Sequence, residues 1–217
     1  MVWIKICGIT NLEDAKGISE LKVDALGFVL SAGSPRKVEW AAAKKIIEAL
    51  RSEGNKISMV GVFVNEEIEK VLKYHESLGL NYIQLSGDEE RDYLEDLKEK
   101  VKDMKIIKSI RIKYENEHYK ARMNEKIEKL NRYMDFILLD SYRKGFYGGT
   151  GVPFNWDIAE DYSGKIPVIL SGGLDPENVR QAVDIVKPFG VDASSRLEIY
   201  PGKKDLDKVI RFVNVLK

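Results

Sequence analysis

The sequence predicts a single α/β domain, residues 1–217, folded as a closed (β/α)8 TIM barrel. Short apolar segments rich in β-branched residues alternate with charged, amphipathic segments, and this alternation occurs eight times. Apolar strands separated by helices are typical of a parallel sheet that is covered on both faces. Eight units of about 27 residues are close to the minimum length of a βαβ repeat. No linker or shift in composition divides the chain, so one domain is expected.

The expected strands are short runs dominated by Val, Ile, Leu and Phe. They cover residues 2–7, 25–30, 58–64, 82–85, 105–110, 136–140, 167–171 and 190–193. Their count favours a barrel over an open, doubly wound sheet. The first run is not followed by a Gly-x-Gly-x-x-Gly turn, which weakens the dinucleotide-binding version of the open sheet.

The expected helices lie between these runs. They cover residues 12–21, 41–51, 68–75, 91–98, 116–131, 156–161, 177–186 and 206–215. Apolar residues in several of them recur at three- and four-residue spacing, as in a helix with one buried face. Asn11 is a suitable N-cap for the first helix. Asp175 is expected to cap the seventh, with Pro176 at the first helical position.

Charge and cysteine content exclude several classes of protein. Lys plus Arg and Asp plus Glu both number 35, whereas surfaces for nucleic acids or anionic membranes need a basic excess. The longest apolar stretch, residues 25–30, is far below the roughly 20 residues that span a bilayer. We therefore expect neither nucleic acid nor a membrane as a partner.

Cys7 is the only cysteine, which rules out a disulfide framework and a cysteine-based zinc site. His75 and His118 lie in charged helical segments with no partner His or Cys, so no metal is expected. A free thiol and an N-terminus without a basic leader fit a reducing compartment, and the expected localisation is cytoplasmic.

Polar and glycine residues follow the expected strands, at the edge where a TIM barrel carries its active site. These residues are Cys7, Gly8, Arg36, Asn65, Gln84, Ser86, Asp140, Ser171, Gly172, Gly173, Asp192, Ser194 and Ser195. Alternation along the first strand points Lys5 and Cys7 into the barrel. A buried lysine needs a partner, and Asp192 on the last strand is the natural candidate. We further hypothesise that Lys5 favours the thiolate form of Cys7.

The loops after the seventh and eighth strands suit phosphate, which TIM barrels often bind there through backbone N–H groups. Ser171-Gly172-Gly173 leads into the seventh helix, and Ser194-Ser195 occupies the matching place after the eighth strand. Gly148-Gly149-Thr150-Gly151 supplies a third loop with accessible amides. Ordinary turn glycines at helix entries are the alternative interpretation.

Each catalytic candidate also has a structural alternative. Cys7 could be a small buried hydrophobic residue, and Asp140 could cap the turn after its strand. Arg36 could be a solvated loop residue. The aromatic residues Tyr142, Phe146 and Tyr147 could equally form a lid over the site or a packed loop.

Several motifs together resemble phosphoribosylanthranilate isomerase, in the order of that family and over almost the whole chain. They are Lys5-Ile6-Cys7-Gly8-Ile9-Thr10, Gln84-Leu85-Ser86-Gly87-Asp88-Glu89, Leu138-Leu139-Asp140, Gly148-Gly149-Thr150-Gly151, Leu170-Ser171-Gly172-Gly173-Leu174, Asn178-Val179, Val191-Asp192-Ala193-Ser194-Ser195 and Pro201-Gly202-Lys203-Lys204-Asp205.

The resemblance implies an Amadori rearrangement in tryptophan biosynthesis, on a small phosphoribosyl substrate and without cofactor or metal. It implies Cys7 as general base, Asp140 as general acid, and Arg36 as the residue that holds the anthranilate carboxylate. Gln84 and Asp192 would also contact the substrate. The phosphate would bind at Gly149, Gly151, Gly172, Gly173, Ser194, Ser195 and Arg196. The chain could be a monomer or a homodimer.

The chain departs from the family pattern at two positions. Ser86 stands where the family usually has His, which affects substrate positioning but leaves the acid–base pair intact. Arg196 stands where the family usually has Gly, and it either adds charge to the phosphate site or crowds it.

Two other functions compete with the isomerase. An indole-glycerol-phosphate synthase-like lyase would need an inward lysine acid and a pair of glutamates, whereas here a cysteine and an aspartate end the strands. A non-catalytic barrel that binds a phosphorylated ligand is the second, motivated by Ser86 and Arg196.

Overall fold

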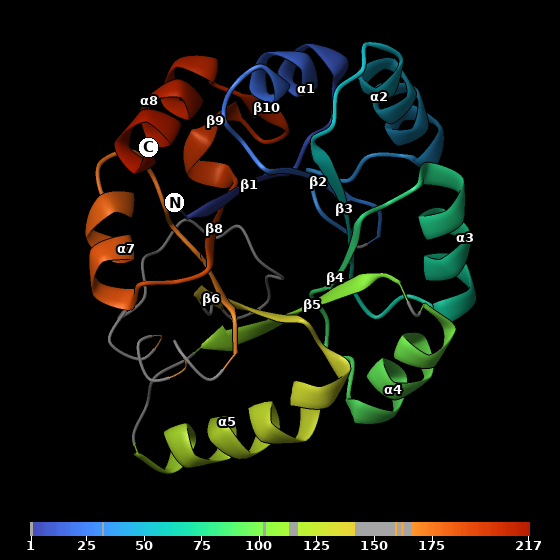
Figure 1. Ribbon diagram of the computed structural model, residues 1–217, viewed down its shortest axis with the longest axis vertical. Helices are drawn as coiled ribbons and strands as arrows, with labels where there is room; N and C mark the ends of the chain where they lie inside the picture. Colours follow the sequence, from blue (N-terminus) through green and yellow to red (C-terminus); the bar gives the residue numbers. More distant parts are fainter. Residues whose placement is uncertain are drawn as a thin grey trace.

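The protein is a closed barrel of eight parallel strands, each paired with the next along the chain and the last paired with the first. The structure, a computed structural model, describes residues 2–31, 33–101, 103–112, 117–141, 159, 162 and 166–217. The strands are β1 (Trp3–Cys7), β2 (Ala25–Val29), β3 (Ser58–Phe63), β4 (Tyr82–Leu85), β5 (Lys105–Ile112), β6 (Phe136–Ser141), β7 (Val168–Ser171) and β8 (Gly190–Ala193). The predicted TIM barrel is therefore confirmed (Figure 1).

Helices surround the barrel on its outside (Figure 1). The described ones are α1 (Leu12–Ser19), α2 (Trp40–Ser52), α3 (Ile68–Leu78), α4 (Arg91–Lys100), α5 (Glu117–Leu130), α7 (Val179–Val186) and α8 (Leu206–Leu216), with short 3-10 turns η1 (Asn131–Tyr133) and η2 (Ser195–Leu197). The helix expected at 156–161 falls almost entirely outside the described residues. None of the helices in the described part has the length and apolar composition needed to cross a bilayer.

The expected cap of α1 is confirmed, but the start of α7 is not where the sequence placed it. Asn11 Oδ1 accepts a hydrogen bond from the Asp14 N–H at 2.9 Å. Asp175 Oδ1 accepts from the N–H groups of Glu177 and Asn178, and its carbonyl accepts from the Val179 N–H at 3.0 Å, so Asp175 caps the turn that leads directly into α7. The regular helix begins at Val179, two residues after the expected start at 177.

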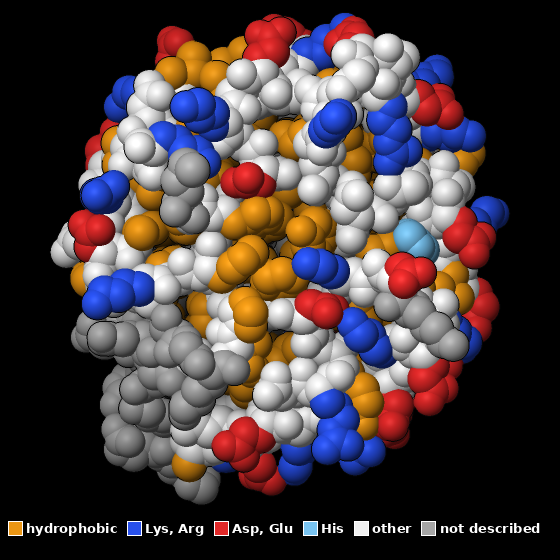
Figure 2. Space-filling model, in the orientation of Figure 1, with side chains coloured by type: hydrophobic (Ala, Val, Ile, Leu, Met, Phe, Trp, Pro, Cys, Tyr) orange, Lys and Arg blue, Asp and Glu red, His pale blue; other side chains and the backbone are white. Residues whose placement is uncertain are grey.

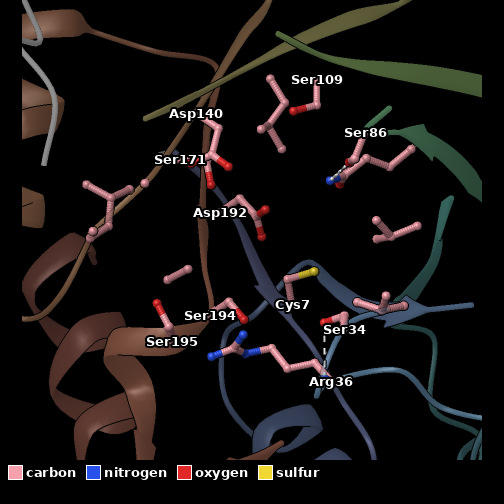
Figure 3. Close-up of a pocket in the computed structure, with 18 of the residues that line it drawn as sticks. Cys7, Ser34, Arg36, Ser86, Ser109, Asp140, Ser171, Asp192, Ser194 and Ser195 are labelled. Carbon is pink, nitrogen blue, oxygen red and sulfur yellow. Dashed lines mark hydrogen bonds between the residues drawn. The ribbon is translucent and has the colours of Figure 1, made fainter. Parts of the chain in front are cut away.

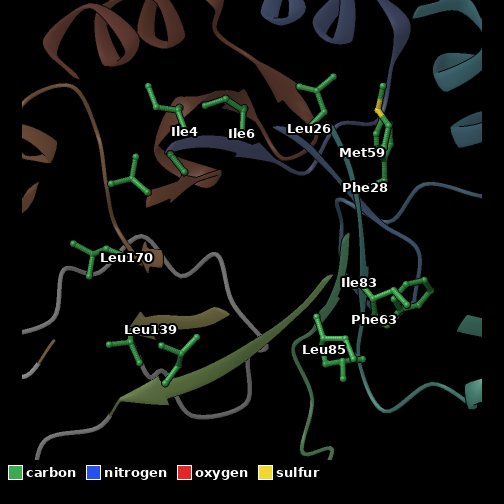
Figure 4. Close-up of a cluster of buried hydrophobic side chains, with 14 of the residues drawn as sticks. Ile4, Ile6, Leu26, Phe28, Met59, Phe63, Ile83, Leu85, Leu139 and Leu170 are labelled. Atoms are coloured by element: carbon green, nitrogen blue, oxygen red, sulfur yellow. The ribbon is translucent and has the colours of Figure 1, made fainter. Parts of the chain in front are cut away.

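The main core lies between the outer faces of the strands and the surrounding helices. Ile4, Ile6, Leu26, Phe28, Leu85 and Leu139 belong to it (Figure 4). Because side chains alternate along a strand, the residues between these point into the barrel. The interior layer formed by Ala25, Val60, Ile107, Leu138 and Ile169 is apolar as well, so the barrel is packed rather than hollow.

Aromatic side chains close the barrel at the N-terminal ends of the strands. The rings of Trp3 and Phe189 have centroids 6.0 Å apart, and the rings of Phe136 and Phe189 lie at 4.8 Å. Tyr82 packs against both Trp3 and Phe136. In Figure 2, hydrophobic side chains gather over the middle of the barrel and charged ones surround them. Packing at this end leaves the opposite end as the place for a ligand.

A two-stranded antiparallel hairpin that the sequence analysis did not expect follows β8. It consists of β9 (Glu198–Tyr200) and β10 (Lys203–Lys204), with Glu198 opposite Lys204. Asp14 in α1 anchors it, since its Oδ2 accepts from the Lys204 N–H at 2.7 Å and its Oδ1 pairs with Lys203 Nζ. This hairpin therefore sits beside the C-terminal end of β1.

Candidate active site

A pocket opens at the C-terminal ends of the strands (Figure 3). The resemblance assigned a catalytic, substrate-binding or phosphate-binding role to twelve residues. Ten of them line this pocket: Cys7, Arg36, Gln84, Asp140, Gly172, Gly173, Asp192, Ser194, Ser195 and Arg196. The other two, Gly149 and Gly151, lie outside the described residues, as do Tyr142, Phe146 and Tyr147.

Lys5 and Asp192 form the buried ion pair that the sequence predicted. Lys5 Nζ lies 2.9 Å from Asp192 Oδ1, and the two residues are register partners in β1 and β8. Burial alone would lower the pKa of Lys5, but Asp192 and Cys7 raise it above its ordinary value. The lysine therefore stays charged inside the barrel, at the level below Cys7.

The Cys7 thiol faces the pocket from the end of β1, beside Val29 and Val62. Burial raises its pKa above the ordinary thiol value, while the Lys5 ammonium acts in the opposite direction. The desolvation of the thiol outweighs the effect of the ammonium group.

Asp140 is the second-last residue of β6 and is buried at the pocket wall. Going round the barrel from β6 to β1, its side chain is followed by Ser171 and Asp192 and then by Cys7. Asp192 consequently lies between Asp140 and Cys7 in Figure 3. One carboxyl group and one thiol therefore reach the same enclosed space from two strands.

Gln84 and Ser86 line the wall formed by β4. Gln84 Nε2 donates to Ser86 Oγ at 3.1 Å, and the buried Oε1 atom has no hydrogen-bond partner in the described part of the chain. A buried amide oxygen that faces a pocket can accept a hydrogen bond from a ligand. Ser86 therefore sets the orientation of the amide.

Arg36 reaches the pocket from the loop before α2, and it is bound by a residue that the sequence analysis missed. Its guanidinium forms a two-pronged ion pair with Glu198, with Nε–Oε1 at 2.9 Å and Nη2–Oε2 at 2.7 Å. The alternative of a solvated loop residue is wrong, because the Arg36 side chain is largely buried. Lys204 also donates to Glu198 Oε1, at 2.8 Å.

The loops after β7 and β8 meet at one side of the pocket. Gly172 and Gly173 have φ angles of +94° and +67°, a backbone conformation that favours glycine. Arg196 is about half exposed at the pocket rim, with Nη1 4.0 Å from Asp175 Oδ2. Its head therefore lies toward α7.

A second buried pair, Glu89 with Lys108, was also missed. Lys108 Nζ lies 2.7 Å from Glu89 Oε2 and donates to the Gly87 carbonyl, while Glu89 Oε1 accepts from the Asn65 N–H. A lysine in the middle of an apolar strand was the available signal, since the same reasoning paired Lys5 with Asp192.

The described residues limit the kinds of reaction that the pocket can support. Within the described ranges, no three His, Cys, Asp or Glu side chains come together as metal ligands do. Neither a lysine nor a glutamate is among the described residues that line the pocket, so the groups required by the lyase alternative are missing from that lining.

A TIM barrel whose pocket combines a carboxyl group, a thiol and an arginine has the features of an acid–base enzyme for a small anionic substrate. The family model for N-(5'-phosphoribosyl)anthranilate isomerase matches residues 4–215. The chain belongs to this family of isomerases.

Relatives support the same assignment over the full length. The N-(5'-phosphoribosyl)anthranilate isomerase of Rubrobacter xylanophilus is 41% identical, with 100% of each chain covered. A structure of monomers of the dimeric enzyme from Thermotoga maritima has a TM-score of 0.81, 37% identity, and coverage of 99% of this chain and 98% of that one. A structure of the isomerase with reduced 1-(o-carboxyphenylamino)-1-deoxyribulose 5-phosphate has a TM-score of 0.82, 38% identity, and 99% and 97% coverage.

Proposed function

We propose that this protein catalyses the Amadori rearrangement of N-(5-phosphoribosyl)anthranilate to 1-(2-carboxyphenylamino)-1-deoxyribulose 5-phosphate, a step of tryptophan biosynthesis that takes place in the cytoplasm. The observation that carries this proposal is the shared pocket of Asp140 and Cys7, with Asp192 between them. The reaction needs one group that gives a proton and one that takes a proton at different atoms of the sugar.

Asp140 is the proposed general acid of the first step. Its carboxyl group protonates the furanose ring oxygen, the bond from that oxygen to C1 breaks, and the lone pair of the anthranilate nitrogen forms the C1=N bond. The product is an open-chain, protonated Schiff base, and Asp140 is left as a carboxylate.

Cys7 is the proposed general base of the second step. Its thiolate takes the proton from C2, and the electrons of that bond form a C1=C2 double bond while the nitrogen becomes neutral. The resulting enolamine tautomerises to the ketone, as C2 loses its hydroxyl proton and C1 gains one. C2 is oxidised and C1 is reduced within one molecule, so no redox cofactor is required.

The remaining pocket residues bind the two ends of the substrate. Arg36 holds the anthranilate carboxylate, for which a planar guanidinium is suited. Gln84 Oε1 accepts from a sugar hydroxyl, and Asp192 contacts the sugar beside Cys7. The phosphate binds to backbone N–H groups near Gly172, Gly173, Ser194 and Ser195, with Arg196 adding charge at the rim. Gly149 and Gly151 are proposed to contribute amides to the same site.

The test is product analysis after incubation of the purified protein with N-(5-phosphoribosyl)anthranilate. We expect the aminoketose, formed without release of carbon dioxide, and no product from a Cys7→Ser/Asp140→Asn double variant. Carbon dioxide release would indicate a lyase. Binding of the substrate without turnover would indicate a non-catalytic barrel, and either result would contradict the proposal.

A further inference from the structure

Arg36 is held at three points along its length. Its backbone N–H donates to Ser34 Oγ at 3.2 Å. Its aliphatic stem crosses Gly8, where a Cβ atom would lie only 2.8 Å from Arg36 Cδ. Its head forms the two-pronged ion pair with Glu198. A long, flexible side chain is thereby confined to one orientation before a ligand binds.

Glu198 is itself fixed from the opposite side. Lys204, its cross-strand neighbour in the hairpin, is buried and donates to Oε1 at 2.8 Å, and the Gly202 N–H donates to the same atom. Lys204 Nζ also donates to the carbonyl of Ser194 in the loop after β8. Burial by itself would raise the pKa of Glu198, but hydrogen bonds from Arg36 and Lys204 hold it below its ordinary value. The carboxylate is therefore ionised.

This arrangement uses only one edge of the guanidinium. Glu198 occupies the edge formed by Nε and Nη2, whereas Nη1 makes no hydrogen bond to a described residue, and the second N–H of Nη2 makes none either. A guanidinium can bind two carboxylates at once through its Nε–Nη2 and Nη1–Nη2 edges.

We propose that Glu198 is a positioning residue for substrate binding: it occupies the Nε–Nη2 edge of Arg36 and thereby presents the Nη1–Nη2 edge to the substrate carboxylate. This inference rests on the proposed function, in which Arg36 binds the anthranilate carboxylate. Lys204 acts indirectly, because its ammonium group donates both to Glu198 and to the carbonyl of Ser194.

A purely electrostatic effect of Glu198 on ligand affinity would have the opposite sign to a positioning effect. Replacing Glu198 by Gln removes a negative charge near the pocket, so electrostatics alone would strengthen the binding of an anionic ligand. Positioning requires weaker binding, because the single carbonyl oxygen of Gln cannot accept from both Nε and Nη2 while also accepting from Lys204. The direction of the change therefore separates the two effects.

The experiment measures the affinity of two ligands by calorimetry. One is reduced 1-(o-carboxyphenylamino)-1-deoxyribulose 5-phosphate, and the other is the anilino compound that lacks only the carboxyl group. The proteins are wild type, Glu198→Gln, Glu198→Asp and Arg36→Met. Asp14→Asn is the matched control, because Asp14 anchors the same hairpin through a buried carboxylate but does not touch Arg36.

We expect Glu198→Gln to weaken binding of the carboxylated ligand by about tenfold or more and binding of the anilino ligand by less than about twofold. Glu198→Asp should show the same selective loss, because its shorter side chain cannot reach both guanidinium nitrogens. Since Glu198→Asp keeps the negative charge, it also provides the test if Glu198→Gln does not fold. Asp14→Asn should lower the melting temperature without a selective effect on the carboxylated ligand. The KM for substrate should rise more than kcat falls in the Glu198 variants.

Equal weakening of both ligands by the Glu198 variants, or tighter binding of the carboxylated one, would overturn the inference. If Arg36→Met shows selective loss and the Glu198 variants do not, the positioning role alone fails. If Arg36→Met binds both ligands as wild type does, the assignment of Arg36 in the proposed function is wrong, and the inference falls with it.

Discussion

Lys5 Nζ and Asp192 Oδ1 lie 2.9 Å apart inside the barrel, one step below the thiol of Cys7 along β1. Both side chains are almost completely inaccessible to solvent. A buried ion pair contributes little stability over an apolar pair, but removing one partner leaves an uncompensated charge. The Lys5 ammonium group also acts on Cys7, where it opposes the effect of burial on the thiol pKa.

The first prediction concerns Lys5→Met. Loss of the ammonium should raise the pKa of Cys7 further and slow its alkylation by iodoacetamide at a given pH, because Lys5 opposes the effect of burial. The free energy of unfolding should fall by about 3–5 kcal/mol, since Asp192 stays buried without its partner. Lys16→Met, which breaks an exposed pair with Glu53, is the control. An unchanged pH dependence of alkylation would show that Lys5 does not act on the thiol.

The second prediction is the pH dependence of Cys7 alkylation by iodoacetamide in the wild-type protein. Burial raises the pKa of Cys7 above the ordinary thiol value, and the reacting form is the thiolate. The alkylation rate should therefore rise with pH, by about tenfold per unit below that pKa, and level off only in the alkaline range. A rate that is already constant between about pH 7 and 9 would be inconsistent with a thiol of raised pKa.

The third prediction concerns Gly27 in β2, which lies beside Cys7 in register. A Cβ atom at Gly27 would lie 2.8 Å from Cys7 Sγ and 2.9 Å from Lys5 Cε, so Gly27→Ala must displace one of them. We expect a loss of about 1–3 kcal/mol in unfolding free energy and at least about tenfold in kcat. Gly33→Ala is the matched control, because no atom lies within 4 Å of its Cβ position. Equal kcat values for the two variants would refute the expected crowding.

The fourth prediction concerns Lys108→Met in β5. Its partner Glu89 accepts from the N–H groups of Asn65 and Gly87, so the pair joins the loops after β3 and β4. Breaking it should cost about 3–5 kcal/mol in urea denaturation. Lys129→Met, which breaks an exposed pair with Glu125, should unfold like wild type. A loss below about 1 kcal/mol for Lys108→Met would mean that the pair does not hold the loops.

Strand alternation explains why much of the site could be predicted from the sequence. It placed Lys5 and Cys7 inside the barrel, and only a residue on a neighbouring strand could pair with a lysine there. Asp192 was the available carboxylate on β8. Strands β4 and β8 begin and end at the expected residues: β4 lies between the polar residues Asn81 and Ser86, and β8 begins with Gly190 and is followed by Ser194.

Strand alternation could not predict contacts between residues that only the tertiary structure brings together. Glu198 and Lys204 look like surface charges in the sequence, and only the hairpin brings them under Arg36. Helix α7 begins two residues later than expected, because a turn at 176–178 lies between its cap, Asp175, and its first regular helical residue.

The most direct test of the proposed mechanism is the turnover of Cys7→Ser compared with its affinity for reduced 1-(o-carboxyphenylamino)-1-deoxyribulose 5-phosphate. A serine hydroxyl fills nearly the same space but is a far poorer proton acceptor at neutral pH. We predict a fall in kcat of about 10³-fold or more, with a dissociation constant within about twofold of wild type. A variant that binds the ligand normally and keeps kcat within about tenfold of wild type would contradict the assignment of Cys7 as the base.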